Sequence, residues 1–146
     1  MTHNFEKEYN KAGWIFADYK NKFNYTDWNI VIYGHNMKSD LMFGTLKNVL
    51  NKEWYENEEN KFITLTTVDG IWKFEVFSVY EEKASDYPIQ TDFKSDSKYL
   101  EFIKNIKSKS IYDFNVDVSA TTGILTLSTC GSDSSNRIVV HAKKVN

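Results

Sequence analysis

The chain contains very few of the residues that crosslink a fold or interrupt it. Its 146 residues include one cysteine, one proline and six glycines. The single cysteine, Cys130, excludes an intrachain disulfide and any metal site built from several cysteines. The single proline, Pro88, lies in the polar stretch 81–91, which we expect to be a loop. We find no low-complexity tract, internal repeat or linker, so the sequence predicts one domain spanning residues 1–146.

A strong charge of one sign and long apolar runs are also missing. The net charge is −2, with lysine and acidic residues interspersed, which gives no broad basic surface. We therefore expect no nucleic-acid partner. No apolar run approaches the ~18–20 residues that a transmembrane helix needs, and residues 1–5 lack the pattern of a signal peptide. The acidic cluster 53–59 lacks the spacing of a calcium loop, so we expect a solvated helix face and no metal.

Arginine is as scarce as cysteine. Of the eighteen basic residues all are lysine except Arg137, which stands seven positions after Cys130. A lone arginine is usually a surface salt-bridge partner, but lysine serves that purpose elsewhere in this chain. A guanidinium is a rigid planar fork of donors, whereas an ammonium is a compact point charge. The sequence therefore predicts that position 137 requires the planar set of hydrogen-bond donors of a guanidinium.

The composition that is present favours a folded, mostly β domain. Hydrophobic residues make up 41% and aromatic residues 16% of the chain, as is typical of globular proteins. The turn Asp69-Gly70 between two apolar runs is a strong hairpin signal. The expected strands cover residues 14–19, 29–33, 61–68, 71–80, 111–120, 123–130 and 137–143. The expected helices cover residues 41–54 and 97–107. This pattern predicts a small β-barrel of about seven strands with helical insertions.

Cys130 stands at the end of the predicted strand 123–130. Free cysteine is often an inert core residue, and it is a candidate nucleophile only where the fold also supplies a base. Strand alternation places Cys130 with Thr126 and Ser128 on the more polar face, at an end of the strand that a substrate could reach. On these observations alone both roles, inert core residue and nucleophile, stay open.

Two histidines compete for the role of base. His35 directly follows the apolar strand 29–33, and Gly34 before it permits close backbone approach. His141 lies four residues beyond Arg137 on one strand, roughly 13 Å away along an extended chain. That separation is too large for one reacting centre. We therefore assign His35 as the general acid and base and His141 as a structural residue.

Three motifs follow one another along the chain. They are Tyr33-Gly-His-Asn-Met37, Thr126-Leu-Ser-Thr-Cys130 and Arg137-Ile-Val-Val-His-Ala-Lys143. Together they resemble the sortases, and the class B sortases in particular. Residues 12–19 resemble the first barrel strand of that class, and the helix near 97–107 falls where that class inserts one. The resemblance covers nearly the whole chain and implies a closed sortase-type barrel of about seven to eight strands with two or more helical insertions.

The resemblance also implies a function. Sortases of this class are cysteine transpeptidases on the extracellular face of the Gram-positive cell membrane, held by an N-terminal anchor that this sequence does not include. They cleave a sorting-signal peptide after Thr and pass the acyl group to an amine of a peptidoglycan precursor or a pilin, without a cofactor. Cys130 would attack, His35 would transfer protons and Arg137 would stabilise the oxyanion. The expected substrate contacts are Ser128, Thr129 and Tyr33.

The residues alone leave two other functions open. L,D-transpeptidases also use Cys, His and Arg, but they typically carry the Arg two residues after the Cys, where this chain has Ser132. A non-catalytic β-barrel binding module with an incidental thiol is the other alternative. Two departures from the sortase pattern bear on substrate preference: the loop from Cys130 to Arg137 is short, and Gly131 stands where some relatives have a larger or acidic residue.

Overall fold

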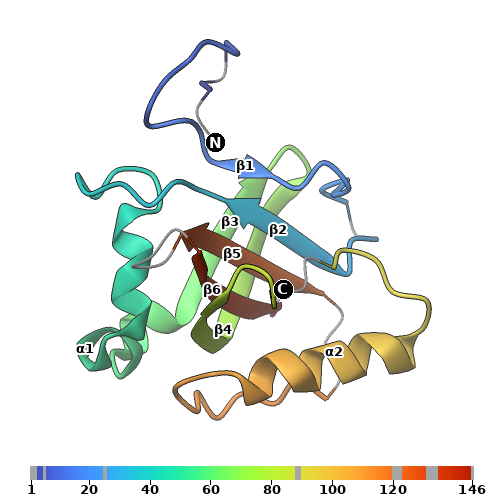
Figure 1. Cartoon of the computed structure of the whole chain (residues 1–146). Helices are drawn as coiled ribbons and strands as arrows, with labels where there is room; N and C mark the ends of the chain where they lie inside the picture. Colours follow the sequence, from blue (N-terminus) through green and yellow to red (C-terminus); the bar gives the residue numbers. More distant parts are fainter. Residues whose placement is uncertain are drawn as a thin grey trace.

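One mixed sheet organises the chain (Figure 1). The computed structural model describes residues 3–4, 6–24, 26–87, 90–119, 123–130 and 135–145. Within these ranges six strands pair in the order β1-β2-β5-β6-β4-β3. The strands are β1 (Phe16–Ala17), β2 (Asn29–Tyr33), β3 (Phe62–Thr67), β4 (Gly70–Lys83), β5 (Ile124–Cys130) and β6 (Asn136–Lys144). The helices are α1 (Lys52–Tyr55), α2 (Asp96–Ser108) and the 3-10 turns η1 (Gly44–Leu50) and η2 (Glu58–Lys61).

The pairing combines hairpins with one parallel contact. β3 and β4 form the predicted antiparallel hairpin, with Thr67 opposite Gly70 across the turn. β5 and β6 are also antiparallel, and so are β4 and β6 and β1 and β2. β2 runs parallel to β5, which brings an early segment of the chain against a late one. The predicted strand 29–33 has the observed bounds because its apolar residues are buried at the centre of the sheet.

The expected closed barrel of seven to eight strands is not what the structure contains. The described strands number six, and they curl into a half-barrel whose two edge strands are β1 and β3 (Figure 1). One reason is that the strand predicted at 14–19 pairs only over Phe16–Ala17. The other reason is the segment 111–119, which was expected to be an edge strand and has no strand structure.

Segment 111–119 follows the core without joining the sheet. Val116 and Val118 alternate as in a strand, and both are buried against the core. Between them the carbonyl groups of Val116 and Asp117 accept from the side-chain amines of Lys107 and Lys143 rather than from a strand. Asn115 has a positive φ of 56°, which breaks an extended chain. The alternation of apolar residues in this segment therefore indicated burial correctly, but it did not indicate pairing with a strand.

The helix expected at 41–54 is divided. η1 and α1 are separated at Asn51, whose ψ of 142° is extended, and Met42 before them has a positive φ. The helix expected at 97–107 is confirmed as α2. Ser95 caps it by accepting from the Lys98 backbone N–H at 3.3 Å, which satisfies one of the donors left free at a helix start.

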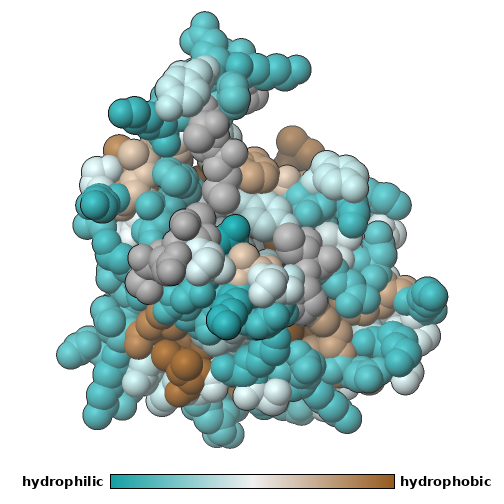
Figure 2. Space-filling model, in the orientation of Figure 1, coloured by the Kyte–Doolittle hydropathy of each residue, from teal (hydrophilic) through white to brown (hydrophobic). Residues whose placement is uncertain are grey.

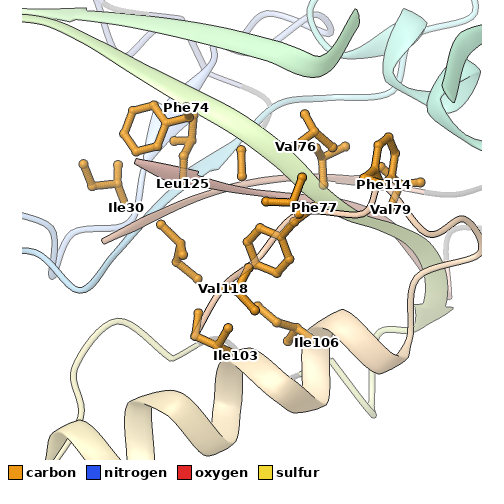
Figure 3. Close-up of a cluster of buried hydrophobic side chains, with 14 of the residues drawn as sticks. Ile30, Phe74, Val76, Phe77, Val79, Ile103, Ile106, Phe114, Val118 and Leu125 are labelled. Carbon is orange, nitrogen blue, oxygen red and sulfur yellow. The ribbon is translucent and has the colours of Figure 1, made fainter. Parts of the chain in front are cut away.

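The core lies between the sheet and α2 and extends to the other face of the sheet. Figure 3 shows Ile103 and Ile106 of α2 directed toward Phe77 and Val118, and all four are buried. Truncating a side chain such as Ile106 to alanine typically costs about 2–5 kcal/mol. The face of the molecule seen in Figure 2 is mainly hydrophilic, with apolar side chains in small separate patches. In the described ranges we find no helix with the length and apolar character required to cross a bilayer.

Candidate active site

The parallel pair β2–β5 brings the candidate residues to one end of the sheet. Tyr33 lies opposite Ser128 in the register, and the Gly34 N–H donates to the Ser128 carbonyl at 3.2 Å. Two residues further along these parallel chains stand His35 on one and Cys130 on the other. Parallel strands lie about 5 Å apart. Tyr33 and Ser128, almost a hundred positions apart in sequence, are thus neighbours in space.

Arg137 completes the group from the other side. It lies directly opposite Cys130 in the antiparallel pair β5–β6, so Cys130 is central between the segment that carries His35 and the strand that carries Arg137. Arg137 is half-buried, and its Nη1 donates to the Asn136 carbonyl at 2.9 Å. The structure describes the backbone of Cys130, whereas its side chain and residues 131–134 lie outside the described part.

The backbone of His35 is fixed by a closed loop. Its carbonyl accepts from the Phe43 N–H at 3.0 Å, and Asn36 forms an antiparallel bridge with Met42. Gly34 is needed because the Phe43 ring covers it: a Cβ at this position would come within 2.4 Å of the ring. The glycine of the Tyr-Gly-His motif thus allows an aromatic ring to pack directly on the chain beside His35.

The ring of His35 has an unused nitrogen. Nδ1 is buried and has no hydrogen-bond partner among the described residues. No carboxylate in that part of the chain therefore orients the imidazole in the manner of a Ser-His-Asp triad. The arrangement fits a cysteine–histidine pair whose imidazole is positioned by its backbone and by packing.

The three predicted substrate contacts lie in different surroundings. Ser128 and Thr129 are each 1% exposed; Ser128 lies opposite Tyr33, whereas Thr129 pairs with Ile138 on the other face. The Tyr33 hydroxyl donates to Asp18 Oδ2 at 3.1 Å, and its ring packs 5.3 Å from that of Phe16. Burial, followed by the charges of Tyr87 and Asp18, raises the pKa of Tyr33, so its phenol stays protonated.

Tyr87 was not identified from the sequence. Burial is the main cause that raises its pKa, and the charges of Tyr80, Glu82 and Asp18 raise it further. These groups belong to β4 and the segment after β1, so Tyr87 lies over the sheet close to the site. The sequence offers no signal for it beyond a tyrosine in a polar loop.

His141 occupies the interior of the same sheet. It is 1% exposed, and its Nδ1 lies 2.8 Å from Thr126 Oγ1 and its Nε2 lies 2.9 Å from the Tyr80 hydroxyl. Thr126 Oγ1 donates its only proton to Asn29 Oδ1 at 2.7 Å, so it must accept from His141 Nδ1–H. Nε2 then accepts from Tyr80. These contacts agree with the predicted structural role.

The environment of His141 keeps it neutral. Burial, and secondarily the charge of Lys109, lowers its pKa to about 3. A charged imidazole here would lose hydration without gaining an anion. No group of three or more histidine, cysteine, aspartate or glutamate side chains gathers into a metal site in the ranges that the structure describes.

Comparisons with known proteins agree with this geometry. A model of the sortase domain matches residues 2–145, and the chain belongs to the sortase family. The relatives that it resembles are sortase B proteins, which confirms the resemblance to class B. Sortase B of Staphylococcus aureus is 36% identical over 142 residues, covering 95% of this chain and 57% of that protein. The chain spans less than two thirds of the length of the curated relatives that it matches.

Solved structures show the same likeness. The X-ray structure of Clostridium perfringens sortase B has a TM-score of 0.89 and 39% identity, covering 99% of this chain and 80% of that chain. The Staphylococcus aureus sortase B–substrate complex has a TM-score of 0.86 and 35% identity, covering 99% of this chain and 68% of that chain. At these identities the likeness extends beyond the fold to the sequence over nearly the whole chain.

Proposed function

We propose that this domain is a sortase B-like cysteine transpeptidase that attaches surface proteins to the cell wall. Its substrate is a C-terminal sorting-signal peptide, cleaved after Thr, and its acceptor is an amine of a peptidoglycan precursor or a pilin. The observation that carries the proposal is the strand register. Arg137 on β6 lies directly opposite Cys130 on β5, and β2, which ends two residues before His35, runs parallel to β5 with Tyr33 opposite Ser128. We place the reaction on the extracellular face of the membrane, as the family implies.

The first half of the proposed reaction forms a thioester. The Cys130 thiolate attacks the carbonyl carbon of the scissile amide, and negative charge develops on the carbonyl oxygen. The guanidinium of Arg137 stabilises that oxyanion. The tetrahedral intermediate then collapses with cleavage of the C–N bond, and the protonated imidazole of His35 gives its proton to the leaving amine. The acyl part of the sorting signal stays bound to sulfur.

The second half transfers the acyl group. The incoming amine attacks the thioester carbon, and the now neutral imidazole of His35 accepts the proton that the amine loses. The second tetrahedral intermediate expels the thiolate, which restores the enzyme and leaves a new amide bond. Arg137 again stabilises the oxyanion. The balance requires no cofactor, because one amide is exchanged for another.

Ser128, Tyr33 and Tyr87 are placed to line the peptide site. Ser128 and Tyr33 are partners in the register two residues before Cys130 and His35, and Tyr87 lies near enough to Asp18 and Glu82 for their charges to raise its pKa. The Staphylococcus aureus relative has been solved as a substrate complex, which supports the proposal that this domain binds a substrate peptide. We propose Thr129 as a contact through its backbone, since its side chain is buried on the opposite face.

The decisive test is replacement of the thiol. Cys130→Ala is expected to abolish cleavage of a library of Thr-containing sorting-signal peptides, with a loss of at least roughly 10⁴, while circular dichroism and the unfolding temperature stay unchanged. Cys130→Ser is expected to be nearly as inactive, because a hydroxyl needs stronger base activation than a thiol. Intact-mass spectrometry of the unmodified enzyme with peptide, but without amine, is expected to show the acyl adduct. Cleavage of these peptides by purified Cys130→Ala, free of other proteases, would refute the cysteine mechanism. Absence of cleavage by the wild-type enzyme would instead favour the non-catalytic binding module.

A further inference from the structure

A shielded ion pair lies beside the arginine of the proposed site. Both carboxylate oxygens of Glu82 accept hydrogen bonds from Lys109 Nζ, each at 2.7 Å. The side chains are only 13% and 29% exposed, whereas in each of the other described ion pairs at least one side chain is more than half exposed. Removing two charges from water is costly, so this pair needs an explanation that surface pairs do not.

The register places the carboxylate in competition for Arg137. Glu82 on β4 lies directly opposite Arg137 on β6, and Arg137 lies directly opposite Cys130 on β5. Side chains opposite one another in an antiparallel pair have Cβ atoms about 5 Å apart. An arginine and a carboxylate at that separation readily form a bidentate pair. Such a pair would turn the donors of the guanidinium toward Glu82 and reduce its positive potential at the reacting carbonyl.

Lys109 is held where it can prevent this. It forms the C-terminal cap of α2, where a positive side chain is favoured by the helix dipole. The next residues fasten this point to β4, since the Val79 N–H donates to Ser110 Oγ at 3.0 Å and the Ile111 N–H donates to the Val79 carbonyl at 2.9 Å. Lys109 Nζ lies 5.7 Å from the centre of the Tyr80 ring and ends on Glu82.

We propose that Lys109 is a positioning residue for the transfer reaction: it holds the Glu82 carboxylate and so keeps the guanidinium of Arg137 directed to the oxyanion. The inference rests on the proposed function, in which Arg137 stabilises that oxyanion. Without the lysine, the uncompensated carboxylate has Arg137 as its nearest cross-strand cation. The pair therefore sets the charge around Arg137 and does more than fasten α2 to the sheet.

The experiment is a double-mutant cycle on kcat and KM with a sorting-signal peptide. Lys109→Met is expected to lower kcat roughly ten- to hundredfold with little change in KM, because a diverted guanidinium is a partial loss of one oxyanion donor. Glu82→Gln, which removes the competing charge, is expected to keep kcat within about threefold. Combining the two substitutions is expected to recover most of the kcat lost in Lys109→Met, which is a coupling that independent sites do not show. Lys109→Arg is expected to retain activity.

Controls separate this idea from a purely structural one. Lys98 and Glu101 form an exposed ion pair on α2 at 2.9 Å, and the matched variants Lys98→Met and Glu101→Gln are expected to leave kcat unchanged. If Lys109→Met does not fold, Lys109→Gln keeps a hydrogen-bond donor for Glu82 and is expected to give a smaller loss in kcat that Glu82→Gln again restores. Wild-type kcat in the lysine variants, or an unrestored loss in the double variants, would overturn the inference. If Arg137→Lys keeps full activity, it is the oxyanion role itself that fails.

Discussion

Two histidines lie on the same sheet and are used in opposite ways. His141 is in the interior, and both of its ring nitrogens are hydrogen-bonded, one to Thr126 and the other to Tyr80. His35 lies at the end of the sheet, and its buried Nδ1 has no partner in the described part of the chain. His35 is also only half-buried, whereas His141 is fully buried. The structural histidine and the reactive one therefore differ in exposure and in whether their donors and acceptors are already engaged.

The two histidines also differ in what holds them. His141 is fixed through its ring, by hydrogen bonds and by contacts with the rings of Phe77 and Phe102. His35 is fixed through its backbone, by the hydrogen bond from Phe43 and by the packing of Phe43 on Gly34. Backbone anchoring leaves the ring nitrogens available for proton transfer. The predictions below test this contrast, from the largest effect to the smallest.

Exchanging the two histidines for alanine is expected to give opposite phenotypes. His35→Ala is expected to lower kcat/KM by roughly 10²–10⁴, the usual contribution of a general acid and base, with little change in unfolding temperature. His141→Ala leaves the Tyr80 hydroxyl without its acceptor in the interior and removes the hydrogen bond that Thr126 accepts. It is expected to cost about 2–4 kcal/mol of stability, while the folded fraction keeps its activity. Peptide-cleavage kinetics and urea unfolding measure the two effects, and reversed phenotypes would assign the base to His141.

Replacing Arg137 tests whether the proposed site needs the donor geometry of a guanidinium as well as its positive charge. Arg137→Lys is expected to lose about 10²–10³ in kcat, or about 3–4 kcal/mol of transition-state stabilisation, because an ammonium cannot reproduce the fork of donors. KM is expected to change little. A rise in KM alone would indicate that Arg137 binds the substrate equally in the ground state and the transition state.

A substitution at Gly34 tests whether the packing of Phe43 on the backbone positions His35. Gly34→Ala places a Cβ within 2.4 Å of the Phe43 ring, so the ring must move; we expect a cost of about 1–3 kcal/mol and roughly tenfold lower kcat. Gly123→Ala is the matched control, since its Cβ would meet only the Asp27 carbonyl at an ordinary 3.5 Å. If both variants behave alike, the packing of Phe43 does not position His35.

The pH dependence of stability tests whether the buried His141 is neutral in the folded state. Because burial lowers the pKa of His141 to about 3, the folded state keeps this group neutral while the unfolded chain protonates it below about 6.5. Stability from this residue is therefore fully present above pH 6.5 and is lost as the pH falls toward 3, by roughly 1 kcal/mol per pH unit. The groups facing the ring are Tyr80, Thr126 and Lys109. The free energy of unfolding, measured with urea between pH 4 and 7, is expected to fall more steeply with decreasing pH in the wild type than in His141→Gln. An equal dependence on pH in the two proteins would contradict a neutral His141.

Much of this arrangement follows from local sequence. The bounds of β2 and of α2 follow from apolar periodicity, and the β3–β4 turn follows from Asp69-Gly70. The division at Asn51 and the loop course of 111–119 do not, because both depend on where carbonyl groups find partners elsewhere in the fold, such as the amine of Lys107 for Val116. Apolar residues at every second position indicate that one face of a segment is buried. They do not indicate that the segment pairs with another strand, because local sequence does not specify that neighbour.

The site divides in the same way. His35 and Arg137 were assigned from motif and strand geometry. The register pairs Arg137 directly with Cys130, and it places β2, which ends two residues before His35, beside β5. Tyr87 and the Glu82–Lys109 pair had no sequence signal. Each is defined by which elements the fold brings together, and a glutamate or lysine in a chain rich in both is inconspicuous until its partner is known.

The parallel contact of β2 with β5, the one such pairing among the described strands, has a consequence for how the protein matures. Parallel neighbours cannot be joined by a tight turn, and here more than half of the chain separates them. Contacts between such distant segments form slowly and late. During synthesis from the N-terminus, β2 must wait for β5 and β6 before it gains its central neighbours. A nascent chain that stops before β5 and β6 therefore has no assembled centre for the reaction, and this domain becomes competent only after both strands have been made.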